Sequence, residues 1–299
     1  MATPKTPSIP RVSSSAIIID HQNRVLMVER NQNSKSFAGA YVFPGGVYDE
    51  KQDASNDRIT AIRETFEESG VLLAHPSGNA LHPSQATLDA ARKAIHSQKM
   101  SFTSFLSDNG LVPDTDSMFP FTQWITPPSI PRRFHAHFFV TFLPPKVSAD
   151  SSGDQGLQHL PTPDGGLEVI TVRFIKPQDA IAEVQAGKIS LMPPQYYLLQ
   201  TLAPIITGHA TTHDQREAVR RLARSGFGGM VINPRPLPYK HEEGYTIMTY
   251  EGDETRGGPP GTLHRSLLIP KKGLMHVVRL ERNFDIFQGI PLQNATSRL

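Results

Sequence analysis

The sequence predicts an α/β protein, and three observations carry this prediction. Short apolar and β-branched runs alternate with stretches of helical period, so both strands and helices occur along the chain. The 26 prolines and 22 glycines indicate many turns and argue against a long helical bundle. The length of 299 residues exceeds the usual size of one domain. We therefore expect one enlarged domain, or one domain with an appendage, around a real core.

Composition and charge exclude several classes of protein. The chain has no cysteine, which excludes disulfides, zinc–thiolate sites, iron–sulfur clusters and thiol nucleophiles. Its 30 basic and 28 acidic residues give a net charge of +2, so we expect no nucleic-acid partner, although a small anionic ligand is compatible. No apolar run approaches the ~18 residues of a membrane span. Residues 1–11 contain three prolines and no signal-peptide core, which predicts a flexible arm and no export.

The first predicted elements are a hairpin and a glycine turn. Residues 16–19 and 25–28 are apolar runs that flank a polar turn, so they predict two paired strands. A short strand at 41–43 follows and leads into Gly45 and Gly46. Two successive glycines allow tight backbone geometry at this point of the chain.

Helices are predicted on both sides of residue 80. Residues 57–69 form an amphipathic pattern that Asn56 or Asp57 can cap and that Gly70 can end. Residues 84–107 form a second helical stretch, broken near Gln98, and are interpreted as an insertion.

The remaining pattern divides the chain into an α/β part and a β-rich extension. Further strands are predicted at 119–125, 133–143 and 167–175, a mobile loop at 147–166, and helices at 177–186, 194–202 and 213–225. Three short strands follow at 245–250, 263–269 and 276–281. We expect an arm at 1–11, a domain at 12–225 and an extension at 226–299.

The helix at 57–69 carries an acidic ridge formed by Glu64, Glu67 and Glu68. Each like-charge pair at this spacing costs about 0.2–0.5 kcal/mol in an isolated helix, and the last two lie at the negative end of the helix dipole. A solvated acidic face is the ordinary interpretation, but it does not explain this placement. A hard divalent cation such as Mg²⁺ or Mn²⁺ would turn the repulsion into binding, and the Gly45 carbonyl could face the same ion.

The segment from Gly46 to the end of this helix resembles the Nudix box. Residues 63–71 read Arg-Glu-Thr-Phe-Glu-Glu-Ser-Gly-Val, against Arg-Glu-apolar-x-Glu-Glu-x-Gly-apolar in the family. Thr65 replaces an apolar residue, and the spacing from Gly46 to Arg63 is three residues longer than in the standard box. The acid in the middle of the box has three candidates here, namely Glu50, Asp53 and Asp57.

The resemblance implies a Nudix-type α/β/α sandwich with a mixed sheet and an enzyme that hydrolyses a diphosphate. By position, Glu64, Glu67, Glu68 and the Gly45 carbonyl would hold Mg²⁺ or Mn²⁺, and Glu64 would orient or deprotonate the attacking water. Such metals neutralise charge on phosphoryl oxygens and lower the pKa of a bound water. Glu168 is either the distal acid that Nudix enzymes often carry or an exposed loop residue.

The residues upstream of the box resemble a motif of the coenzyme A subgroup. The spacing from Leu26 to Gly46 matches Leu-Leu-Thr-x-Arg-Ser/Ala, three residues, Arg, three, Gly, three, Phe-Pro-Gly-Gly, with several substitutions. A lysine replaces the second arginine and keeps its charge but not its bidentate fork. The resemblance implies substrate contacts at the matching positions, which are Arg30, Lys35, Gly39 and Phe43. Alternatively, Phe43 belongs to a turn shared with other Nudix branches and Arg30 is a charge at a strand end.

Four features together resemble the larger peroxisomal coenzyme A diphosphatases: the extended box, the helical insertion after it, the strand segment at 131–139 and the turn at 191–194. Arg132 and Arg133 are candidate contacts for an anionic substrate, but adjacent strand residues face opposite ways, so at most one reaches a given cleft. His135 and His137 share a face, and packed strand histidines are the more common outcome.

Together these observations predict a metal-dependent hydrolase that cleaves coenzyme A or acyl-CoA to 3′,5′-ADP and (acyl-)phosphopantetheine. Two alternatives stay open: a diphosphatase of NADH, nucleotide sugars or prenyl diphosphates, and a Nudix-fold binding module without catalysis. The residues Ser297, Arg298 and Leu299 resemble the Ser-Lys-Leu address that a peroxisomal import receptor reads. We therefore expect a peroxisomal protein, or a cytoplasmic one if this signal is not used.

Overall fold

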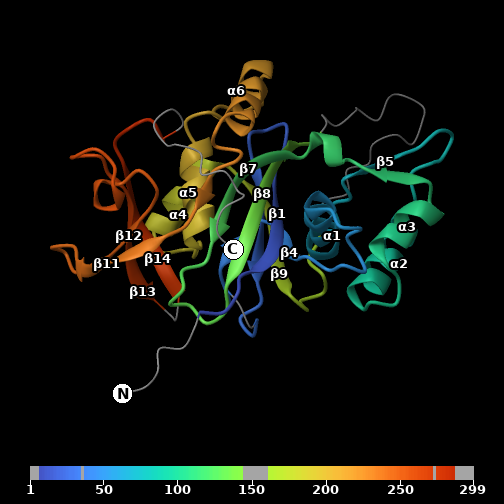
Figure 1. The fold of residues 1–299 in the computed structure, drawn as a ribbon. Coiled ribbons are helices and arrows are strands. Elements are labelled where there is room, and N and C mark those ends of the chain that lie inside the picture. Colours follow the sequence, from blue (N-terminus) through green and yellow to red (C-terminus); the bar gives the residue numbers. More distant parts are fainter. Residues whose placement is uncertain (1–6, 35–36, 144–160, 272–273, 287–299) are drawn as a thin grey trace.

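A central mixed sheet forms the body of the protein (Figure 1). The computed structural model describes residues 7–34, 37–143, 161–271 and 274–286. In this part of the chain the sheet has eight strands in the order β10-β7-β8-β1-β2-β3, with β4 paired to β1 and β9 paired to β2. The strands are β1 (Arg11–Ile19), β2 (Val25–Arg30), β3 (Tyr41–Val42), β4 (Gly45–Val47), β7 (Phe119–Ile125), β8 (Phe134–Phe142), β9 (Val169–Ile175) and β10 (Val231–Ile232).

Strand β1 is apolar on both sides because both faces of the sheet are covered. Its alternation sends Ile17 and Ile19 to one core and Ala16 and Ile18 to the other. It pairs in parallel with β8 along its whole length and antiparallel with β2 and β4. The parallel pair joins segments more than a hundred residues apart in the chain.

Helices cover the two faces, which confirms the predicted α/β/α sandwich. On one face lie α1 (Asp57–Ser69), α2 (Gln85–His96) and α3 (Phe102–Asp108); on the other lie α4 (Pro177–Gln185), α5 (Pro193–Leu202) and α6 (His213–Arg224) (Figure 1). The predicted break in the insertion is confirmed, since Gln98 has a φ of 57° between α2 and α3. Two short paired strands, β5 (Ala74–Pro76) and β6 (Leu111–Pro113), join the insertion to the body.

The chain beyond residue 225 forms a second sheet with the order β11-β12-β13-β14. Its strands are β11 (Arg235–Lys240), β12 (Thr246–Thr249), β13 (His264–Lys271) and β14 (Leu274–Arg282), and short 3₁₀ turns lie at Thr115–Ser117 and Glu254–Arg256. Tyr250 packs against Trp124 of the main sheet with 5.3 Å between ring centroids. Strand β10 even pairs with β7 of that sheet. The boundary at residue 225 stays a prediction, and the hydrophobic core continues across it.

Several predicted segments lie wholly or partly outside the described residues. They are most of the loop at 147–166, most of the arm at 1–11, Lys35, and the tripeptide at 297–299. Arg11 belongs to β1. Among the helices that are described, none combines the length and the apolar character required to cross a membrane.

Candidate active site

Helix α1 carries the acidic residues, and its ends are set by local chemistry. The Asn56 side chain accepts the Arg58 N–H at 2.9 Å, and the N–H of Gly70, which has a φ of 74°, donates to the Phe66 carbonyl. Ile62 and Phe66 are fully buried on its apolar side. The three glutamates are also largely buried, and the exposed fractions of their side chains are 16% for Glu64, 11% for Glu67 and 4% for Glu68. A solvated acidic face is therefore excluded.

The two glycines after β3 fit directly against these carboxylates. The Gly45 N–H donates to Glu68 Oε2 at 3.0 Å. A Cβ atom on Gly46 would lie 2.3 Å from Glu64 Cδ, so any larger residue would displace that carboxylate from its observed position. The structure shows Gly45 contacting the site through its N–H, and a metal-binding role of its carbonyl stays a prediction.

Arg63 contacts two of the glutamates and orients their side chains. Its Nη1 lies 2.8 Å from Glu64 Oε1 and 2.9 Å from Glu67 Oε1. Its Nε and Nη2 bind Asp53 at 2.7 and 3.1 Å, a bidentate pair that is almost completely buried. This contact identifies Asp53 as the acid that supports Arg63 in this longer box.

The other two candidates for that position lie elsewhere. Glu50 is exposed. Asp57 accepts a hydrogen bond from His137 Nδ1 at 2.8 Å, and this bond lowers the pKa of Asp57. The neighbouring His135 is hydrogen-bonded to Gln123, and burial lowers its pKa to about 4. Both histidines are packed strand residues in this structure.

Burial makes the carboxyl groups of Glu64 and Glu68 weak acids. Desolvation raises the pKa of Glu64 to about 7, although Arg63 opposes the shift. Desolvation and then the Glu64 charge raise the pKa of Glu68 to about 8, against the influence of Arg30. Burial thus favours the protonated forms of both carboxyl groups, whereas a bound cation would favour their ionised forms.

The residues present fit a divalent cation in their chemistry. Carboxylate oxygens are the ligands that Mg²⁺ and Mn²⁺ prefer. Glu64 and Glu68 would hold the ion, each by exchanging its present arginine contact. Over the described ranges, no three His, Asp or Glu side chains converge on one point as metal ligands. Glu67 faces Arg63 and His96, with 3.4 Å between His96 Nδ1 and Glu67 Oε2, and its role as a ligand stays a prediction.

Arg30 joins a distant acidic residue to this cluster. Its Nη1 lies 2.8 Å from Glu68 Oε1 and its Nη2 lies 3.1 Å from Glu168 Oε2. The structure thus links Glu168, the candidate distal acid, to Glu68 of α1 through Arg30. Arg30, expected as a substrate contact, bridges the two carboxylates, and its buried Nε lacks a hydrogen-bond partner within the described structure.

Two other predicted contact residues shape the turn before the site. Gly39 has a φ of 70° and donates its N–H to the Arg30 carbonyl at 3.1 Å. Phe43 is 1% exposed and packs edge-on against Phe138, with 6.2 Å between ring centroids. Core packing is sufficient to explain the aromatic residue at this position.

The basic residues before β8 lie at the start of that strand. Arg133 donates to the backbone carbonyls of Thr126 and Ser8, at 3.0 and 2.8 Å, and thereby fastens the N-terminal segment. Arg132 is exposed. Substrate contacts by Arg132, Arg133 and Lys35 stay predictions, and Lys35 is outside the described residues.

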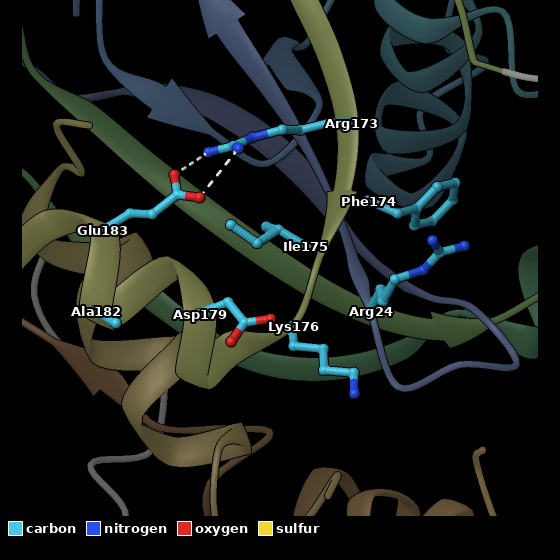
Figure 2. A pocket seen from close by; sticks show the side chains of 8 residues that line it. All are labelled: Arg24, Arg173, Phe174, Ile175, Lys176, Asp179, Ala182 and Glu183. Atoms are coloured by element: carbon cyan, nitrogen blue, oxygen red, sulfur yellow. Dashed lines mark hydrogen bonds and ion pairs between the residues drawn. The ribbon is translucent and has the colours of Figure 1, made fainter. Parts of the chain in front are cut away.

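A separate hollow lies beside the end of β9 and the start of α4, where β9 pairs with the first half of β2. Figure 2 shows Arg24, Arg173 and Lys176 among the residues that line it. Arg24 is paired with Asp20, and Arg173 is paired with Glu183. Most of the positive charge around the hollow is therefore neutralised. This hollow is not part of the carboxylate cluster.

Sequence reasoning missed the contribution of α2. Arg92 donates from Nε to the Glu67 carbonyl at 2.8 Å, and His96 approaches the Glu67 side chain. The sequence did contain a signal for this contribution. Arg92 and His96 lie four positions apart on one face of an amphipathic helix whose other packed residues are apolar.

Comparison with known proteins agrees with this geometry. Residues 55–202 match the family described as the NUDT19 Nudix domain. The putative nudix hydrolase 7 of Caenorhabditis elegans is 31% identical over 188 residues, which cover 61% of this chain and 56% of that protein. The acyl-coenzyme A diphosphatase NUDT19 of Gallus gallus is 29% identical over 162 residues, which cover 48% of this chain and 39% of that protein. The matches thus span about two fifths to just over half of these relatives.

A solved structure shares the fold. The crystal structure of a NUDIX hydrolase from Alicyclobacillus acidocaldarius superposes with a TM-score of 0.54 and 22% sequence identity. The superposition covers 66% of this chain and 92% of the other.

Proposed function

Since this chain belongs to the Nudix hydrolase family and resembles its acyl-CoA diphosphatase subgroup, we propose that it hydrolyses the diphosphate of coenzyme A or acyl-CoA. The products are 3′,5′-ADP and (acyl-)phosphopantetheine. One observation carries the proposal: the buried carboxyl groups of Glu64 and Glu68 are held against the Gly45-Gly46 turn by two arginines. Packing two carboxyl groups together out of water costs stability, which a divalent cation would offset, so the arrangement favours a metal-dependent catalytic site over a binding module.

The cofactor we infer is Mg²⁺ or Mn²⁺, held by Glu64 and Glu68. When bound, such an ion neutralises charge on the phosphoryl oxygens and lowers the pKa of a coordinated water. The protein's own residues supply orientation. Arg63 fixes the Glu64 carboxyl group through Oε1, and Asp53 fixes Arg63 in turn.

Glu64 is the residue we assign to orienting or deprotonating the attacking water. Arg63 holds its Oε1 at 2.8 Å, and a bound cation would keep the carboxylate ionised, which is the form that a general base requires. Arg30 is the residue we assign to the substrate, because its guanidinium lies between Glu68 and Glu168 and carries a charge that a diphosphate would attract.

A substrate panel tests the proposal. Purified protein is incubated with coenzyme A, acyl-CoAs, ADP-ribose, NADH and prenyl diphosphates, with Mg²⁺ or with EDTA. We expect Mg²⁺-dependent turnover of coenzyme A or acyl-CoA that Glu64→Gln abolishes. Glu50→Gln, a change at an exposed acid of the loop before α1, should leave this turnover intact. Turnover of the other compounds with no cleavage of coenzyme A would overturn the substrate assignment.

We also propose that Ser297, Arg298 and Leu299 act as a peroxisomal import signal. The support is their match to the Ser-Lys-Leu type of address. A fluorescent protein fused before residue 1 should colocalise with a peroxisomal marker, and deletion of Leu299 should disperse it. Identical distributions of the two fusions would contradict the proposal.

A further inference from the structure

Arg92 of the helical insertion binds three groups at the end of the catalytic helix. Its side chain is buried, at 9% exposure for the residue. Nε donates to the Glu67 carbonyl at 2.8 Å, Nη1 to Thr162 Oγ1 at 3.0 Å, and Nη2 to the Thr162 carbonyl at 2.8 Å. A buried guanidinium therefore joins α2, the last turn of α1, and the segment at 162–168.

That segment is held at its start by α1 and α2. The Thr162 N–H donates to the Ser69 carbonyl at 2.9 Å, immediately beside the Arg92 contacts. A cation close to the last carbonyls of α1 also complements the negative end of the helix dipole.

The segment is held at its other end beside Arg30. The Asn31 side chain donates to the Gly166 carbonyl at 2.7 Å, and the Asn31 N–H donates to the Glu168 carbonyl at 2.8 Å. Inside the segment, the Asp164 carboxylate accepts the N–H groups of Gly166 and Glu168 at 3.0 and 2.8 Å. These contacts give residues 162–168 one backbone course, which ends with Glu168 on Arg30.

We propose that Arg92 is a positioning residue, which fixes residues 162–168 across the end of α1 so that Glu168 reaches Arg30 at the catalytic carboxylates. This inference rests on the proposed function for its catalytic consequence. It assigns a role to the helical insertion, whose α2 supplies the guanidinium.

The three contacts explain why arginine occupies this position. Its planar group presents Nε, Nη1 and Nη2 in fixed directions, which match a carbonyl on α1 and two oxygens of Thr162. A lysine ammonium is a single point and cannot reach all three acceptors.

The test compares Arg92→Met and Arg92→Lys with Lys93→Met, a change at the adjacent exposed residue of the same helix. We expect Arg92→Met to lower kcat by roughly 10- to 100-fold with KM little changed, as for other residues that support catalytic groups. Arg92→Lys should recover part of the loss, and Lys93→Met should match the wild type. Because Arg92 acts through Glu168, adding Glu168→Gln to Arg92→Met should lower kcat little further.

Amide hydrogen exchange gives a readout that does not require turnover. In Arg92→Met, the amides of residues 162–168 should exchange faster than in the wild type, while those of β1 stay protected. If the wild type hydrolyses no diphosphate, the proposed function fails, but this measurement still tests the positioning. Unchanged exchange at 162–168, or unchanged kcat in a folded Arg92→Met protein, would overturn the inference.

A second variant covers the case in which Arg92→Met does not fold. Thr162→Val removes only the hydroxyl that accepts from Nη1 and keeps both backbone contacts. It should show the same pattern of faster exchange and lower kcat, with a smaller amplitude. Wild-type exchange and kcat in Thr162→Val would then overturn the inference.

Discussion

Replacing Asp53 by asparagine should destabilise the protein and disorganise the site. The Asp53 carboxylate is fully buried and accepts hydrogen bonds from Arg63 at 2.7 and 3.1 Å, from Thr60 Oγ1 at 2.9 Å and from the Asp49 N–H at 2.8 Å. Removing one member of a buried ion pair costs about 3–5 kcal/mol, because the other charge is left uncompensated. In Asp53→Asn, Arg63 keeps two glutamate partners and the asparagine side chain keeps one acceptor oxygen. We therefore expect the free energy of unfolding to fall by an amount near the lower limit, about 3 kcal/mol.

Activity should fall with the same substitution. Arg63 loses its bidentate anchor and no longer fixes Glu64 and Glu67. If these glutamates act in catalysis as proposed, kcat should decrease by roughly 10- to 100-fold. Urea unfolding, followed by the fluorescence of the single and buried Trp124, measures the change in free energy. Glu50→Gln is the matched control, and as an exposed change it should stay within about 0.5 kcal/mol of the wild type. A loss below about 1 kcal/mol for Asp53→Asn, or an equal loss for Glu50→Gln, would refute the reasoning.

The buried glutamates, the glycine turn and the C-terminal extension each lead to a further prediction. Because burial raises the pKa values of Glu64 and Glu68 from 4.5 to about 7 and about 8, the folded metal-free protein binds more protons than the unfolded chain between these values. The stability of the metal-free protein should therefore fall as the pH rises from about 4.5 to 8. Over the same range, the increase in melting temperature that Mg²⁺ produces should grow. A metal-free stability that rises with pH would contradict the raised pKa values of Glu64 and Glu68. Gly46→Ala would place a Cβ atom 2.3 Å from Glu64 Cδ and should abolish turnover, whereas Gly229→Ala meets no atom within 4 Å and should be neutral; equal activities would refute the packing argument. Deleting residues 226–299 removes part of the shared hydrophobic core and should yield protein without a cooperative unfolding transition. A truncated chain with the wild-type melting temperature would instead show that residues before 226 form an independent domain.

Helix α1 was predictable because its signals are local. The Asn56 cap, the Gly70 stop and the helical period lie within fifteen residues, and the structure reproduces the predicted bounds of 57 and 69. The acidic ridge was visible for the same reason, since residues three and four apart on a helix are neighbours.

The surroundings of that ridge were not predictable from local pattern. Arg30 meets Glu68 across 38 positions of the chain, and Arg92 meets Thr162 across 70. Such contacts depend on how β1, β2 and β8 pair, and no short spacing encodes them. The longer loop after Gly46 likewise left three candidates for the acid on Arg63, which only the folded loop distinguishes.

The second sheet shows a different reason for a missed element. The prolines at 236 and 238 argue against a strand, yet β11 forms, with a register irregularity between Pro236 and Lys240. Strand β10, which belongs to the central sheet, has two residues and is too short for an alternating pattern to show. The sequence pattern therefore predicted the later strands of the extension and missed β10 and β11.

The measurement that tests the central claim most directly is product analysis of coenzyme A incubated with the full-length protein and Mg²⁺. The account predicts equal amounts of 3′,5′-ADP and phosphopantetheine, with neither product formed in EDTA or by a folded Glu68→Gln protein. Intact coenzyme A under all conditions, or cleavage that Glu68→Gln and EDTA leave unchanged, would contradict it.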